Sequence, residues 1–214
     1  GIMSLDPKLS KNASSLNNLS WQQACNLASS GATVLHERSA YLAQKEKIPL
    51  EIKHSTKENS SYTHIGEKAL EKKGLYALTY IKDQNLYTLN IKKNEHSKLL
   101  SFLDENNIRL TLLTQEIFAN NKNYKIDLAT TKDNSHYLNI FLQKNNCALA
   151  TEKNLSFIYL HGFNLSNDKK LIFTISSLMQ NKLKFLQTYD QKITLLVRQD
   201  DFENTIHELE KLIN

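Results

Sequence analysis

The sequence predicts a mixed α/β chain of the α+β type, in which two small ferredoxin-like modules follow a helical segment. Apolar residues make up 40% of the 214 residues and charged residues 23%, which is the composition of a globular chain. Beyond Gly74, short apolar runs alternate between the strand period and the helix period. The alternation runs twice, each time in the order β-α-β-β-α, which is typical of a ferredoxin-like repeat.

Within residues 1–66, the segment that starts at Ser20 is predicted to form a helix with clear start and stop signals. Ser20 and Gln23 have the spacing of a capping box, and Leu19 is placed to pack against the first turn. Gly31 is placed to end this helix in the left-handed conformation.

A second short helix and a strand complete this first segment. Pro49 excludes a helix interior, and residues 50–53 alternate as a strand should. Residues 54–63 are polar and predict a loop. Residues 67–74 are charged and end in glycine, which indicates a connector between domains.

Each of the two modules is read from short apolar runs. The first has a strand at 85–91, a helix at 97–106, strands at 108–114 and 123–129, and a helix at 135–145. The second has a strand at 155–160, a helix at 168–181, strands at 184–188 and 192–198, and a helix at 200–213. Asp168 and Asp200 stand where acidic helix caps are favoured.

Composition excludes several classes of function. The net charge is +5, but the lysines are dispersed, which favours a solvated surface over a nucleic-acid partner. No apolar run has membrane-spanning length, so we expect no membrane partner and a cytoplasmic protein. Cys25 and Cys147 are far apart and predict reduced thiols, and the histidines lack metal-ligand spacing.

Residues 19–55, LSWQQACNLASSGATVLHERSAYLAQKEKIPLEIKHS, resemble the last part of the catalytic domain of aspartate kinases. The opening GIMSLDPK is similar to that family's Gly-Val-Tyr-Thr-Thr-Asp-Pro-Arg turn. Residues 107–116 resemble a strand of its ACT domains, small regulatory modules that bind amino acids, and residues 191–197 resemble the end of the second module.

The resemblance implies three parts. Residues 1–66 are expected to be the C-terminal helices and strand of an amino-acid-kinase domain. Residues 67–148 are expected to hold the connector, a strand at 75–81 and the first ACT domain. Residues 149–214 are expected to form the second ACT domain, completed by strand 75–81.

The resemblance also implies one wall of a nucleotide pocket. Asp6, Lys8 and Val34 match positions that touch the nucleotide in the family, whereas Met3 replaces a tyrosine and Thr33 replaces a lysine. The family's phosphate-holding Lys-Phe-Gly-Gly segment is absent. We therefore expect no catalytic residue, cofactor or metal in this chain and no activity from it alone, with ATP and Mg expected for the complete enzyme.

For an amino-acid effector, lysine or threonine, the resemblance points to two short polar segments. The candidates are Asn94 and Glu95 in one segment, and Thr114 and Glu116 in the other. Thr111 stands where the family has an aspartate, which predicts weak lysine binding. His36 follows an apolar pair at a helix start and is expected to cap that helix or to pack against it, and the other histidines are expected at the surface.

Two functions follow from these patterns. The first is the regulatory C-terminal part of an aspartate kinase, which senses an amino acid and forms homodimers through its ACT domains. The alternative is a non-catalytic ACT subunit or degenerate relative that binds an amino acid or only dimerises. A nucleic-acid-binding ferredoxin-like domain is disfavoured, because the strand aromatics beside glycines of RNA-recognition modules are absent.

Overall fold

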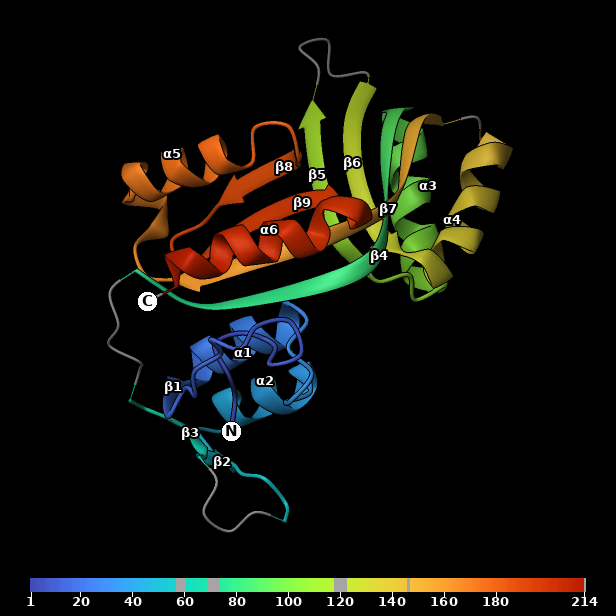
Figure 1. Ribbon diagram of the computed structural model, residues 1–214. Helices are drawn as coiled ribbons and strands as arrows, with labels where there is room; N and C mark the ends of the chain where they lie inside the picture. Colours follow the sequence, from blue (N-terminus) through green and yellow to red (C-terminus); the bar gives the residue numbers. More distant parts are fainter. Residues whose placement is uncertain (57–60, 69–73, 118–122, 146, 214) are drawn as a thin grey trace. The chain divides into compact units, whose positions relative to one another are not determined.

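The computed structural model describes residues 1–56, 61–68, 74–117, 123–145 and 147–213 (Figure 1). The chain divides into two compact units. Unit 1 comprises Gly1–Ile81 and Phe157–Asn214, and unit 2 comprises Lys82–Ser156. The three-part division expected from the sequence stays a prediction, and much of its connector, residues 67–74, lies outside the described residues.

The first part of unit 1 contains two short helices and a small three-stranded sheet. Its elements are β1 (Asn18–Ser20), α1 (Trp21–Ser29), α2 (Glu37–Lys45), β2 (Leu50–Ile52) and β3 (Thr63–Gly66), and the sheet order is β1-β3-β2. The predicted capping box is present, because Gln23 N donates to Ser20 Oγ and Ser20 N donates to Gln23 Oε1.

The strand β4 (Leu75–Lys92) is a single element 18 residues long, where the sequence predicted two separate strands. It lies between β6 (Asn123–Thr131) and β7 (Ala148–Gly162) in the sheet. Adjacent strands provide hydrogen bonds along an extended backbone, so the polar residues near Asp83 do not break the strand although Asp83 has a φ of 56°.

The rest of unit 1 is a helix-covered sheet with strand order β4-β7-β9-β8. Its further elements are α5 (Lys169–Leu178), β8 (Leu183–Thr188), β9 (Lys192–Arg198) and α6 (Phe202–Leu209), and Figure 1 shows both helices beside these strands. Fully buried side chains from both helices and from three strands share one core, including Ile158, Leu160, Ile175, Leu195, Phe202 and Leu209.

The helix caps of unit 1 agree only in part with the prediction. Asp168 caps α5, because its Oδ1 accepts a hydrogen bond from Leu171 N at 2.9 Å. Asp200 does not cap α6. It lies in a 3-10 turn, Gln199–Asp201, that precedes the helix. The last predicted helix is therefore shorter than expected and has a 3-10 turn at each end.

Unit 2 has the strand order β5-β6-β4, with helices α3 (Lys93–Glu105) and α4 (Lys132–Asn145) packed on its apolar side chains. The strand β5 spans Leu110–Ile117. Its core combines side chains of β4, β6 and both helices, including Tyr87, Leu89, Leu99, Ile126, Leu128 and Leu138.

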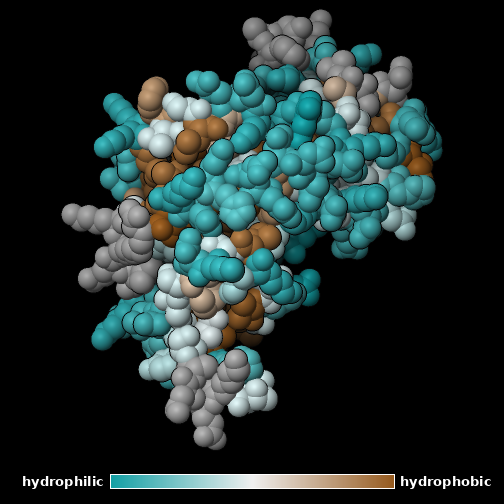
Figure 2. Space-filling model, viewed as in Figure 1, coloured by the Kyte–Doolittle hydropathy of each residue, from teal (hydrophilic) through white to brown (hydrophobic). Residues whose placement is uncertain are grey.

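Hydrophilic residues cover most of the face drawn in Figure 2, which agrees with the dispersed charge in the sequence. None of the helices in the described part of the chain is both long and apolar enough to cross a membrane.

Candidate functional site

Three segments that are far apart in the sequence line a pocket of about 320 Å³ within unit 1. The first is the N-terminal turn, with Ile2, Met3 and residues 5–8. The second is the segment after α1, residues 31–34, and the third is residues 78–80 of β4. The pocket thus combines the Asp-Pro-Lys turn and the Gly31 segment that the sequence singled out. It adds a strand that the sequence did not assign to a site.

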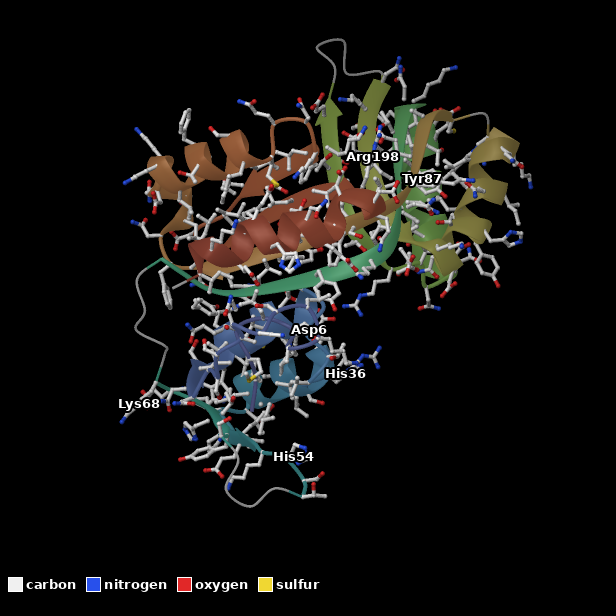
Figure 3. The ribbon with its side chains drawn as sticks, in the orientation of Figure 1. Asp6, His36, His54, Lys68, Tyr87 and Arg198 are labelled. Atoms are coloured by element: carbon white, nitrogen blue, oxygen red, sulfur yellow. The ribbon has the colours of Figure 1, made fainter. Side chains whose placement is uncertain are left out.

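The N-terminal turn is shaped by Asp6. The Asp6 carbonyl oxygen accepts hydrogen bonds from Leu9 N at 2.9 Å and from Ser10 N at 3.1 Å. Its Oδ1 accepts from Lys8 N at 2.9 Å. Its Oδ2 accepts from the hydroxyl of Tyr80 at 2.7 Å. Asp6 therefore organises its own turn and also joins that turn to β4, beside which it lies in Figure 3.

Glycine is required where the second wall approaches β4. Gly31 has a φ of 95°, which other residues rarely adopt. A Cβ at this position would also collide with the carbonyl oxygen of Tyr80. The predicted left-handed end of α1 is thus confirmed, and it brings Thr33 and Val34 to the pocket.

The walls of the pocket have two kinds of chemistry. The apolar part comes from Ile2, Met3, Leu5, Val34 and Leu78, and among the described residues that line the pocket Asp6 and Lys8 carry charge. Burial raises the pKa of Tyr80 to about 12, and the hydrogen bond and charge of Asp6 add to this rise, so the phenol stays a donor. A pocket of this size with apolar walls and a few polar groups suits a small molecule that has both apolar and polar parts.

The structure places all three predicted nucleotide-contacting residues at this one pocket. Asp6, Lys8 and Val34 line it together with the substituted positions Met3 and Thr33. Val34 is 54% exposed, which leaves an apolar side chain available to a ligand. Tyr80 was missed, because an isolated tyrosine in a strand carries no motif.

The predicted effector residues lie on two elements of unit 2. Asn94 and Glu95 belong to the first turn of α3, because this helix begins at Lys93 and not at residue 97 as predicted. Glu95 Oε2 accepts from Lys92 N at 2.8 Å and so caps the helix start. Asn94 is exposed.

Thr114 and Glu116 lie on β5 and face residues of β6. Thr114 is opposite Asp127 and Glu116 is opposite Lys125, whose Nζ lies 3.9 Å from Glu116 Oε2. Lys92, just before α3, pairs with Asn123 of β6, and Glu116 pairs with Lys125 of the same strand. The start of α3 and Glu116 are therefore near the same end of the sheet. Thr111 lies five residues before Glu116 on β5, and its hydroxyl donates to Gln84 Oε1 at 2.6 Å.

The histidines agree with the prediction at one position and depart from it at another. His36 caps α2, because its Nδ1 accepts from Arg38 N at 3.3 Å. His161 was expected at the surface, but its side chain is fully buried in β7. The apolar residues around it in the sequence, 157–160, were the available signal for burial.

No family model matches the sequence. The chain is 27% identical over 220 residues to the aspartokinase of Rickettsia felis and 29% identical over 231 residues to that of Rickettsia conorii. Each comparison covers 99% of this chain but 54% of the relative. The chain therefore spans about half the length of the curated relatives it matches.

Solved structures give the same likeness in fold. Aspartokinase III of E. coli, in a complex with aspartate and ADP, has a TM-score of 0.82 and 20% identity over all of this chain and 50% of that one. The regulatory subunit of aspartate kinase from Thermus thermophilus has a TM-score of 0.56 and 11% identity, over 66% of this chain and 100% of that one. The predicted fold class and the resemblance to the C-terminal part of aspartokinases are confirmed.

Proposed function

We propose that this chain is the regulatory C-terminal part of an aspartate kinase, an enzyme that phosphorylates aspartate with ATP. The observation that carries the proposal is the likeness to aspartokinases over 99% of the chain. The pocket adds to this support, since two segments that carry the family resemblance, at residues 5–8 and 31–34, line one cavity.

The pocket is proposed to hold the base and sugar of a nucleotide. The half-buried Met3 and the exposed Val34 offer apolar surface to a flat ring, and the Lys8 ammonium is a cation for an anionic group at the rim. The solved E. coli relative was crystallised with ADP. For this chain, ATP and Mg are the expected cofactors of the complete enzyme, and no step of phosphoryl transfer is assigned to its residues.

Unit 2 is proposed to sense an amino acid, lysine or threonine. Another E. coli aspartokinase III structure contains lysine and aspartate. The carboxylates of Glu95 and Glu116 are candidate partners for a ligand ammonium, and Asn94 and Thr114 for its carboxylate. Such a ligand regulates the enzyme only through a difference in affinity between two conformations. We further propose a cytoplasmic homodimer.

A nucleotide titration tests the pocket. Adding ADP to the chain is expected to shift the NMR signals of residues 5–8, 31–34 and 78–80. Lys8→Ala is expected to weaken binding, because it removes the cation at the rim, and Lys11→Ala is the matched control from the same segment. Signal changes that spare these three segments would contradict the proposed nucleotide site.

An activity assay tests whether the chain is only a part of the enzyme and is inactive by itself. The chain alone is expected to form no aspartyl phosphate from ATP and aspartate, since the residues that hold the phosphates in the family are missing from it. Turnover by the pure chain would overturn this expectation. The alternative of a separate ACT subunit predicts that no kinase segment precedes Gly1 in the coding sequence.

A further inference from the structure

We propose that Tyr80 is a positioning residue of the pocket, which holds the Asp6 turn at the distance from the Gly31 segment that a bound nucleotide requires. The inference rests on the proposed nucleotide site and extends it to a residue on β4. Neither the sequence motifs nor the family likeness points to this residue.

The Asp6 carboxylate is held from two sides. Lys8 N donates to Oδ1 at 2.9 Å, which is a bond within the turn. Tyr80 donates to Oδ2 at 2.7 Å, which is a bond from outside the turn. A hydrogen bond to a charged acceptor is among the stronger ones in proteins. Tyr80 therefore restrains both the side chain of Asp6 and the turn that this side chain organises.

The donor side chain also packs against the core of unit 1. The Tyr80 ring packs edge-on against Phe202, with ring centroids 5.0 Å apart and an interplanar angle of 67°. Phe202 is 1% exposed and belongs to the main core of unit 1. Two residues earlier on β4, Leu78 N donates to Ser4 O at 2.8 Å. The strand thus holds the N-terminal segment at two points.

Tyr80 also limits how closely the opposite wall, the Gly31 segment, can approach β4. A Cβ at Gly31 would collide with the carbonyl oxygen of Tyr80, so the backbone of the Gly31 segment approaches Tyr80 as closely as glycine allows. The hydroxyl of Tyr80 contacts one wall and its carbonyl the other. Tyr80 is therefore close to both walls of the pocket, at Asp6 through its hydroxyl and at Gly31 through its carbonyl.

The test compares Tyr80→Phe, which removes only the hydroxyl, with the ligand-free wild-type chain. Hydrogen exchange of the amides of Lys8, Leu9 and Ser10, which bond to Asp6, is expected to become about tenfold faster, a factor that corresponds to about 1.4 kcal/mol. The midpoint of thermal unfolding is expected to change little. Tyr41→Phe is the control, since Tyr41 is 63% exposed on α2 and lies outside the pocket.

A double variant shows whether Tyr80 acts through its hydrogen bond to Asp6 or through the packing of its ring. In an Asp6→Ala chain, Tyr80→Phe is expected to leave the exchange of these amides unchanged, because the bond is already lost. Unchanged exchange in the single variant would overturn the proposal, and so would faster exchange throughout unit 1 with a large fall in the unfolding midpoint.

ADP affinity provides the functional measurement. Tyr80→Phe is expected to weaken ADP binding about tenfold, a change of about 1.4 kcal/mol. If the wild-type chain binds no ADP, the nucleotide site is wrong, and the exchange experiment still decides whether Tyr80 holds the turn. If ADP binds equally to both chains, Tyr80 does not position the site.

Discussion

Thr79 and His161 form a hydrogen bond inside unit 1, with Thr79 Oγ1 2.9 Å from His161 Nε2. His161 is fully buried, and its Nδ1 has no hydrogen-bond partner among the described residues. Burial and the nearby charge of Lys192 lower the pKa of His161 to about 3. The imidazole is therefore neutral at neutral pH, and protonating it in place would bury an uncompensated charge.

The stability of the chain is expected to fall as the pH is lowered from about 6.5 to about 3. In this window the unfolded chain binds a proton at His161 and the folded chain does not, so acid favours unfolding by up to about 1.4 kcal/mol per pH unit. Urea unfolding of wild type and His161→Leu at pH 7, 5 and 4 measures this. His161→Leu is expected to lose the part of the pH dependence of the free energy of unfolding that comes from His161. His54→Gln, at an exposed position, is the control and is expected to keep this pH dependence.

Gly31→Ala is expected to destabilise unit 1 more than Gly74→Ala does. Both glycines have positive φ, at 95° and 81°. A Cβ at residue 31 collides with β4, whereas at residue 74 it meets nothing within 4 Å. Gly74→Ala is expected to cost about 1 kcal/mol, from its backbone conformation alone. Equal midpoints in the thermal unfolding of the two variants would contradict this prediction. They would show that β4 moves away from a Cβ at residue 31 without a cost in stability.

The chain is expected to be a homodimer that uses β5, because this strand ends the sheet order and so leaves a pairing edge. Leu113 is 46% exposed on β5, whereas Leu110 packs against the core, so a charge at Leu113 tests the edge without disturbing the core. Leu113→Lys is expected to lower the mass measured by light scattering. Ile140→Lys, on an exposed position of α4, is the control. A monomeric wild type at tens of micromolar would contradict this prediction.

The resemblance predicts that Thr111→Asp improves lysine binding, whereas the hydrogen bond of Thr111 in the structure leads us to expect a destabilised unit 2 and no improvement in binding. Thr111 donates to Gln84, whose nitrogen in turn donates to Lys82 O. An aspartate would face the Gln84 oxygen, so the carboxamide must rotate and lose the bond to Lys82, at a cost of about 1 kcal/mol. Calorimetry with lysine and urea unfolding of both chains measure the two effects. Tighter lysine binding by the variant would contradict this prediction and would indicate that residue 111 contacts the effector.

Local signals in the sequence were sufficient wherever neighbouring residues decide the structure. The capping box of Ser20 and Gln23, the left-handed Gly31 and the cap at Asp168 depend on side chains and backbone within a few residues of each other. Asp6, Lys8 and Val34 belong to short motifs through which the sequence resembles the family, so the resemblance could point to them, and their contact with a nucleotide stays a prediction.

Only the tertiary structure joined the predicted strands 75–81 and 85–91 into β4, since the strands on either side provide the hydrogen bonds that keep the polar stretch between them extended. Only the tertiary structure placed Tyr80 against Asp6 and buried His161 beside Thr79. These contacts join residues 74 and 82 positions apart in the chain, and pairing at that separation depends on how the sheet assembles, which no local pattern specifies.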